Sequence, residues 1–224
     1  MVDWRTGIAR ESGRYLASLE RTDIDPFAFA DAWRMRYVPA MAAVIGGSRP
    51  FVVLDTLHRE MLEDVLGAYE IDVAGVGEAR LVDWVRAWHR LDPWSDAVEG
   101  LTRLKKRFPI VALSNGNVVL ILDMARRAGL PWDAILGAEF SRAYKPDPRA
   151  YLATAQTLAV DPGELCLVAA HHSDLGGARK SGLRTAFVDR PSEYGGAPAP
   201  DASARQEWDW TASDLIDLAL QLGC

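Results

Sequence analysis

The chain has 224 residues, of which 49% are hydrophobic and 25% are charged, a composition typical of a globular protein. Its net charge of −6 argues against a general nucleic-acid binder, and no Lys/Arg run suggests a basic patch. No apolar run reaches transmembrane length, and the start has no signal-peptide pattern, so we expect no membrane partner. Cys166 and Cys224 form neither a disulfide framework nor a zinc spacing, which favours a reducing cytoplasm.

Residues 1 to about 90 have the periodicity of helices. The predicted helices of this part cover residues 8–19, 26–41, 55–69 and 78–88. Residues 51–54 form a strand-like exception, and with Asp55 they resemble a strand that presents a nucleophile. An amphipathic helix follows at once, so we interpret Asp55 as the N-cap of that helix.

From residue 97 onward, predicted strands and helices alternate, which indicates a parallel sheet with helices on both faces. The predicted strands cover residues 109–113, 134–136, 166–170 and 185–188. The predicted helices cover residues 97–106, 118–128, 147–158 and 211–222, with a Gly-rich, closely packed helix after Asp174 that ends at Gly182. Residues 192–210 are expected to be mostly loop.

Polar side chains follow three of these predicted strands. They are Ser114 and Asn115, Lys145, and Asp174. The carboxyl ends of strands in an open parallel sheet meet at one crevice, so we expect these groups to lie together. A hydroxyl, an amide, a cation and a carboxylate can together hold an anionic substrate and activate water. Each has a simpler interpretation when taken alone: helix caps for Ser114, Asn115 and Asp174, and a solvated charge for Lys145.

The same residues belong to longer motifs, and with two further segments these motifs are spread over essentially the whole chain. These motifs are Leu113-Ser-Asn-Gly116, Tyr144-Lys145-Pro-Asp-Pro-Arg-Ala-Tyr151, Val168-Ala-Ala-His171-His-Ser-Asp174, Ala32-Trp-Arg34 and residues 88–94. In this combination the chain resembles the haloacid dehalogenase superfamily. More narrowly, it resembles the type II L-2-haloacid dehalogenases, which hydrolyse a carbon–halogen bond next to a carboxylate.

The resemblance implies a fold and a domain order. It implies an α/β protein in which a Rossmann-like parallel-sheet core carries an inserted α-helical cap. Residues 1–7 are then a remnant of the core start, 8–91 the cap and 92–224 the core, with the first core strand missing from this chain. Similar proteins are often homodimers, so a homodimer is possible here.

The resemblance also implies roles for individual residues. Arg34 would take the leaving halide, and Ser114 and Asn115 would hold the substrate carboxylate and the halide. Lys145 would keep the nucleophile ionised, since a nearby opposite charge lowers a carboxyl pKa. Asp174 would be the general base for the hydrolytic water.

Two further residues are expected at the substrate. Tyr151 would position Lys145 and contribute to substrate binding, although a helical Tyr is often simply packed. His171 stands where many relatives have Asn, and it is either a second polar group at the substrate or a pH-dependent replacement for that Asn. Ala169 replaces a Ser that some members use to hold water.

The resemblance implies chemistry without a metal or cofactor. Phosphatases of the superfamily bind Mg²⁺ with two acids four residues apart in the last motif. Ala170 stands in the place of the first acid, which leaves Asp174 alone. One carboxylate is a poor magnesium site.

The family nucleophile is an aspartate in an Asp-x-x-Gly-Thr turn, which forms an ester that water then hydrolyses. This turn does not occur in the chain, and Val2-Asp3-Trp4-Arg5 matches the segment that follows it in the family. We therefore expect the nucleophile to lie before residue 1, and the chain as printed to be inactive.

Three functions remain open at this stage. The first is an L-2-haloacid hydrolase acting on a small halogenated carboxylate. The alternative is a non-catalytic relative that binds a small carboxylate or halide. A magnesium-dependent phosphatase is third. Halide release separates the first two.

Overall fold

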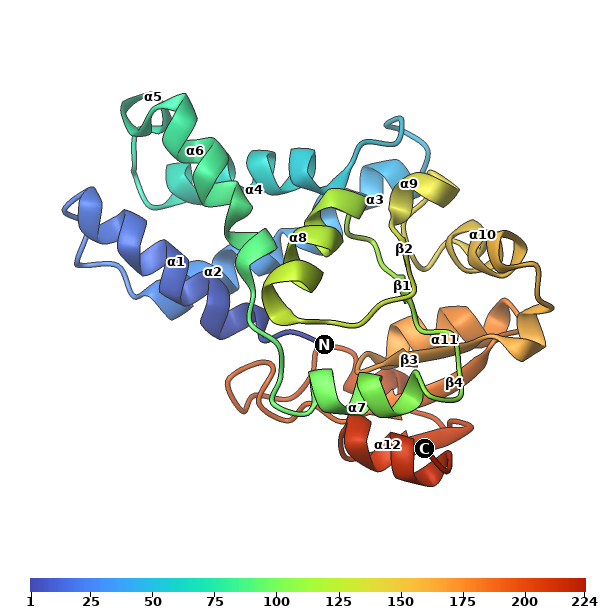
Figure 1. Ribbon diagram of the computed structural model, residues 1–224. Coiled ribbons are helices and arrows are strands. Elements are labelled where there is room, and N and C mark those ends of the chain that lie inside the picture. Colours follow the sequence, from blue (N-terminus) through green and yellow to red (C-terminus); the bar gives the residue numbers. More distant parts are fainter.

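The computed structural model describes all 224 residues, with a helical region followed by a region that carries all the strands (Figure 1). The helical region contains α1 (Trp4–Ser18), α2 (Pro26–Met35), α3 (Tyr37–Ile45), α4 (Leu54–Ala68), α5 (Val73–Val76), α6 (Glu78–Val85) and the 3-10 helix η1 (Arg86–Arg90). The strand region contains α7 (Ala97–Leu104), β1 (Val111–Leu113), α8 (Val118–Ala128), β2 (Ala134–Leu136), α9 (Ala138–Ser141), α10 (Pro148–Leu158), η2 (Pro162–Glu164), β3 (Cys166–Ala169), α11 (His172–Lys180), β4 (Arg184–Val188), η3 (Ala202–Ala204), β5 (Trp210–Ala212) and α12 (Leu215–Gln221). None of the helices combines the length and apolarity needed to cross a membrane.

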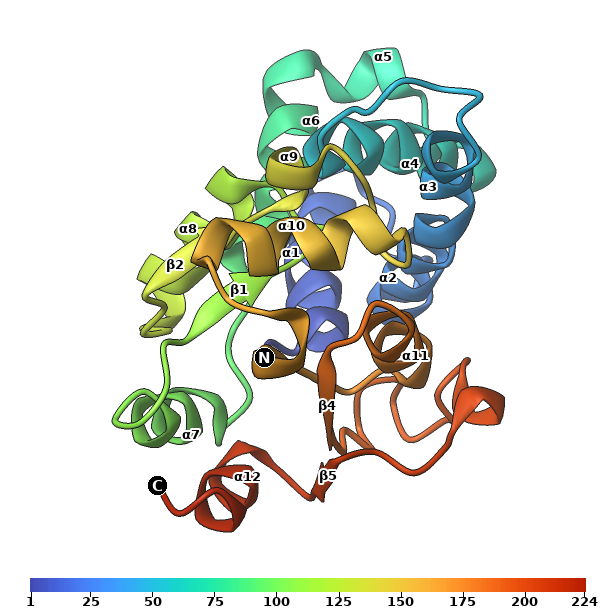
Figure 2. The ribbon, with the colours of Figure 1, turned by 90° about the vertical axis from the view of Figure 1, so that its right-hand side faces the viewer.

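The predicted α/β class and the parallel strands are confirmed, but the strands do not form one continuous sheet. β1 pairs with β2, and separately β3, β4 and β5 form a second sheet in that order, all pairs being parallel. Figure 2 shows the β1–β2 pair apart from β4 and β5, with α11 packed beside β4. No segment of residues 1–224 forms a strand between β1 and β3, so each of these two strands has an unpaired edge.

The predicted helix over residues 26–41 is two helices. Its backbone remains helical at Arg36, but the chain is divided there into α2 and α3. Residues 51–54 form no strand. Val53 is the extended residue before α4, and Asp55 lies inside its first turn. The interpretation of Asp55 as the N-cap was therefore wrong, because Val53 occupies that position.

Short elements were the ones that the sequence did not reveal. The sequence predicted none of α5, α9 and β5, each of which has three or four residues. β5 exists because Trp210–Ala212 pairs with β4, with Thr211 opposite Phe187. The last helix consequently starts at Leu215 rather than at 211, and the Asp214 carboxylate caps it by accepting from the backbone N–H of Asp217 (2.7 Å).

The two regions share one apolar core. The largest cluster contains 30 buried residues, among them Phe29, Trp33 and Trp84 from the helical region and Leu120 and Tyr144 from the strand region. A second cluster of 11 residues lies between α7, β4 and α12. Gly100 is required there, because a Cβ on this residue would lie 2.4 Å from the Cβ of Leu215. Continuous burial of this kind fixes the helical region against the strand region.

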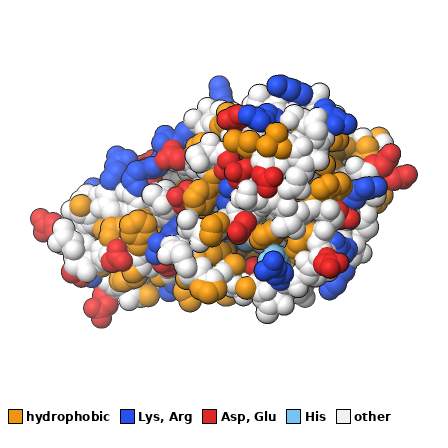
Figure 3. Space-filling model, turned by 90° about the horizontal axis from the view of Figure 1, so that it is seen from below, with side chains coloured by type: hydrophobic (Ala, Val, Ile, Leu, Met, Phe, Trp, Pro, Cys, Tyr) orange, Lys and Arg blue, Asp and Glu red, His pale blue; other side chains and the backbone are white.

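The face of the molecule drawn in Figure 3 has no large region of one charge. Acidic and basic side chains are interspersed on the face drawn in Figure 3, with apolar side chains scattered among them.

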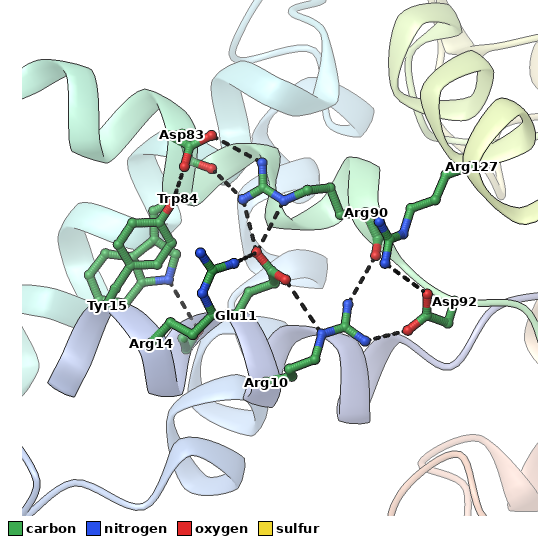
Figure 4. Close-up of polar contacts among 10 residues, drawn as sticks. Arg10, Glu11, Arg14, Tyr15, Asp83, Trp84, Arg90, Asp92 and Arg127 are labelled. Atoms are coloured by element: carbon green, nitrogen blue, oxygen red, sulfur yellow. Dashed lines mark hydrogen bonds and ion pairs between the residues drawn. The ribbon is translucent and has the colours of Figure 1, made fainter. Parts of the chain in front are cut away.

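A buried carboxylate ties α1 to the end of the helical region (Figure 4). Glu11 is 4% exposed and forms ion pairs with Arg10 (3.4 Å), Arg14 (3.5 Å) and Arg90 (3.0 Å). Arg10 also pairs with Asp92, which in turn binds Arg127 of α8 at 3.1 Å. The network therefore joins α1 to η1 and to the strand region.

Replacing Glu11 with alanine is expected to destabilise the protein by about 2–3 kcal/mol. The change removes the carboxylate that the surrounding guanidinium groups share, and breaking a buried ion pair is costly. The partial exposure of the arginines to solvent reduces that cost. Urea unfolding measures the difference. Arg14→Ala is the matched control, because its side chain is 76% exposed. Equal stabilities of the two variants would contradict the assignment.

Candidate active site

A lysine–aspartate pair joins the ends of the two sheets. Lys145 lies in the loop before α10, and Asp174 lies in the first turn of α11, just after β3. Lys145 Nζ donates to Asp174 Oδ2 at 2.6 Å and to the carbonyl oxygen of Leu113, at the end of β1, at 3.3 Å. Both charged side chains are largely shielded, with 14% and 17% exposed. The expected convergence of these two groups at strand ends is therefore present.

Tyr151 of α10 completes the environment of Asp174. Its hydroxyl donates to Asp174 Oδ1 at 2.8 Å, and the ring is fully buried. Burial, together with the neighbouring carboxylate, raises the pKa of Tyr151, so the hydroxyl stays a donor. Tyr151 thus contacts Asp174 rather than Lys145. The approach depends on Gly177 in the closely packed helix, because a Cβ there would lie 2.5 Å from the tyrosine hydroxyl oxygen.

The loop after β1 holds Lys145 through its main chain. Asn115 Oδ1 accepts from the backbone N–H of Lys145 at 2.7 Å, and its Nδ2 lies 3.5 Å from Met41 Sδ of α3. Ser114 Oγ accepts from the N–H of Gly116 at 2.9 Å. Asn115 therefore positions Lys145 directly, whereas the Ser114 side chain closes its own turn.

Arg34, in the last turn of α2, forms no ion pair with an acidic side chain. Its guanidinium lies over the rings of Tyr37 (4.3 Å) and Trp4 (5.7 Å), and it takes part in no hydrogen bond or ion pair. Stacking on two aromatic rings leaves its N–H donors free for an anion. No contact joins Arg34 to Lys145 or Asp174.

His171, at the start of α11, belongs to a second polar group. Its Nε2 lies 3.0 Å from Glu193 Oε1 and 3.4 Å from the hydroxyl of Tyr194. Trp4 Nε1 donates to the same Glu193 oxygen at 3.2 Å. Burial raises the pKa of Glu193, but the hydrogen bond and charge of His171, together with the positive charges of Arg34 and the N-terminus, outweigh it, so the net pKa is lowered. Through Trp4 this group adjoins Arg34.

The structure thus arranges the predicted residues in two groups. Lys145, Asp174, Tyr151 and Asn115 form one hydrogen-bonded cluster, and Arg34 and His171 lie around Trp4 and Glu193. Sequence reasoning missed Glu193, which lies in a loop segment without periodicity or motif. No group of three or more His, Cys, Asp or Glu side chains is placed to hold a metal ion. The catalytic and binding roles stay predictions.

Comparison with known proteins agrees with the family resemblance of the sequence. The family model for haloacid dehalogenase-like hydrolases matches residues 9–182. The chain is 40% identical over 118 residues to (S)-2-haloacid dehalogenase 4A of Burkholderia cepacia, covering 50% of this chain and 51% of that protein. It is 37% identical over 125 residues to (S)-2-haloacid dehalogenase 1 of Pseudomonas sp. (strain CBS-3), covering 53% and 54%. These alignments therefore span about half the length of the curated relatives.

Solved structures extend the similarity to the whole chain. The crystal structure of a defluorinating L-2-haloacid dehalogenase superposes with a TM-score of 0.96 at 50% identity, covering 100% of this chain and 91% of that one. A second L-2-haloacid dehalogenase gives a TM-score of 0.89 at 43% identity, covering 99% and 94%.

Proposed function

The chain belongs to the haloacid dehalogenase-like hydrolases, and on that premise we propose that it serves in the hydrolysis of small L-2-haloalkanoic acids to 2-hydroxy acids. The geometry that carries this proposal is the Lys145–Asp174–Tyr151 cluster at the strand ends, together with the unpaired guanidinium of Arg34. The cluster supplies a positioned base, and Arg34 supplies N–H donors for an anion.

The chemistry proceeds in two steps. A carboxylate attacks C2 of the substrate, so that a carbon–oxygen bond forms, the carbon–halogen bond breaks and halide leaves toward Arg34. Water then attacks the carbonyl carbon of the ester while Asp174 takes a proton from the water. The acyl carbon–oxygen bond breaks, so the attacking carboxylate is regenerated, and the leaving oxygen takes up a proton to give the 2-hydroxy acid. Lys145 provides the positive charge beside these carboxylates, and Asn115 fixes the main chain of Lys145.

The first step requires an attacking carboxylate in addition to Asp174. Asp174 is the acid paired with Lys145, and its oxygens are bound by Lys145 and Tyr151. The attacking carboxylate is therefore a residue other than Asp174. Activity is tested on the protein as its host makes it, with its intact mass measured first.

Chloride release from L-2-chloropropionate is the deciding measurement. We expect release from the L-enantiomer and none from the D-enantiomer, with no requirement for added Mg²⁺. Binding of chloropropionate without release by the native protein would support the binding alternative. Mg²⁺-dependent phosphate release from a phosphomonoester would instead support a phosphatase.

We also propose the finer assignments that accompany this function. Residues 8–91 would form the cap and 92–224 the core, with residues 1–7 as the core start. Both cysteines are free thiols, which fits a reducing cytoplasm. Independence of metal and cofactor, the roles of Ser114 and His171 at the substrate, and a homodimer remain part of the proposal.

A further inference from the structure

Asp55 bonds a residue of the loop that follows β1. Its Oδ2 accepts from Asn117 Nδ2 at 2.8 Å, and its backbone N–H donates to Asn117 Oδ1 at 3.3 Å. Asn117 is 4% exposed and occupies the N-cap position of α8, but its side chain makes no cap hydrogen bond. The Asn117 side chain therefore binds α4 instead of capping α8. The two hydrogen bonds connect the loop of residues 114–117 to the helical region.

The other oxygen of Asp55 faces a buried histidine. His89 of η1 is 5% exposed, and its Nε2 lies 3.1 Å from Asp55 Oδ1. Its Nδ1 lies 2.8 Å from Asp123 Oδ2 of α8. Both ring nitrogens can donate only when the imidazole is protonated. Burial by itself lowers the pKa of His89, but the hydrogen bonds and charges of Asp55 and Asp123 outweigh it, so the pKa is raised.

The remaining charged groups of the neighbouring elements have other partners. Glu11 of α1 and Asp83 of α6 bind Arg90, and Arg127 of α8 binds Asp92. His58 of α4 is buried, and burial lowers its pKa to about 3, which leaves it neutral. The positive charge on His89 is thus balanced by Asp55 and Asp123.

A connected path leads from this histidine to the candidate active site. Asp55 joins His89 to Asn117, and Asn115, two residues earlier in the same loop, holds the main chain of Lys145. We propose that Asp55 and His89 are positioning residues. The proton shared between them keeps the loop of residues 114–117 in the position from which Asn115 binds the main chain of Lys145. The catalytic consequence rests on the proposed function, whereas the structural coupling does not.

The coupling is tested by NMR on residues 1–224. We expect the side-chain amide resonances of Asn117 to shift with pH at the same midpoint as the ring protons of His89. Asp55→Ala should abolish this response, because it removes the link. Asp123→Asn is the matched control, because it lowers the His89 midpoint but keeps the Asp55–Asn117 contact. Asn117 resonances that do not follow His89 in wild type, or that still follow it in Asp55→Ala, would overturn the inference.

The consequence for the site is tested by kinetics on the native-length protein. Asp55→Ala is expected to lower kcat/KM for L-2-chloropropionate about tenfold at every pH, since a displaced loop misplaces Lys145. The Asp123→Asn variant should be active at low pH. As the pH rises, its activity should fall with a midpoint at a lower pH than that of wild type. Unchanged kinetics in both variants would overturn the inference while the proposed function stands. A wild type that releases no chloride would remove the proposed function, and the NMR result would still decide the coupling.

Discussion

Lys145→Ala is expected to abolish halide release by the native-length protein, with a loss of at least about 10²–10³-fold in kcat. The ammonium group lies 2.6 Å from Asp174 and 3.3 Å from the carbonyl oxygen at the end of β1, so it is the cation around which the strand ends are arranged. Removing a preorganised charge or donor from a reacting centre typically costs this much. Chloride release at saturating L-2-chloropropionate measures the effect.

Lys106→Ala serves as the control for Lys145→Ala, because Lys106 is exposed and forms no ion pair. Its turnover should equal that of wild type. Circular dichroism and urea unfolding of the Lys145 variant separate loss of chemistry from loss of fold. Activity that survives in a folded Lys145→Ala protein would show that the site has been assigned to the wrong residues.

His58 is expected to make the protein unstable in mild acid. It is 1% exposed, its ring stacks on Trp88 with 4.5 Å between centroids, and neither ring nitrogen has a hydrogen-bond partner. Burial lowers its pKa from 6.5 to about 3. Between these values the unfolded chain binds the proton and the folded protein does not. Stability is therefore fully present above the unfolded pKa, and falls by about 1.4 kcal/mol per pH unit as the pH drops through this window.

His58→Phe should remove this dependence, because phenylalanine keeps the stack on Trp88 and carries no titratable group. Only the backbone carbonyl of residue 58 accepts from Trp33 Nε1, so that hydrogen bond survives the change. Urea unfolding at about pH 7 and about pH 5 should show wild type losing about 2 kcal/mol more than the variant. Parallel pH profiles of the two proteins would mean that His58 is protonated in the folded state.

The candidate site could be predicted where local sequence decides position. Asp174 lies a few residues beyond β3, and Lys145 lies beyond β2 and the short helix α9. Both therefore come after the carboxyl ends of parallel strands, where such residues are brought together. The partner of Tyr151 could not be predicted in the same way. It depends on the close approach of α10 to α11 at Gly177, which is a property of packing.

Asp55 shows the limit of local patterns. A polar residue before an amphipathic helix is typical of an N-cap, but helix starts are uncertain by one or two residues. Here the helix starts one residue before Asp55, and the carboxylate binds Asn117, 62 positions away in the chain. Glu193 had no local signal at all, since its partners His171 and Trp4 come from distant segments.

The interrupted sheet affects how the protein associates with other protein molecules. β1 and β3 each leave one edge without a strand partner, and such edges are templates for pairing with strands of other molecules. Lys145 occupies one carbonyl of β1, and both strands are short, with three and four residues, which limits this tendency. The protein nevertheless has free edges on β1 and β3 in addition to the outer edges of β2 and β5, so we expect its aggregation to depend on concentration more than that of a protein with a continuous sheet.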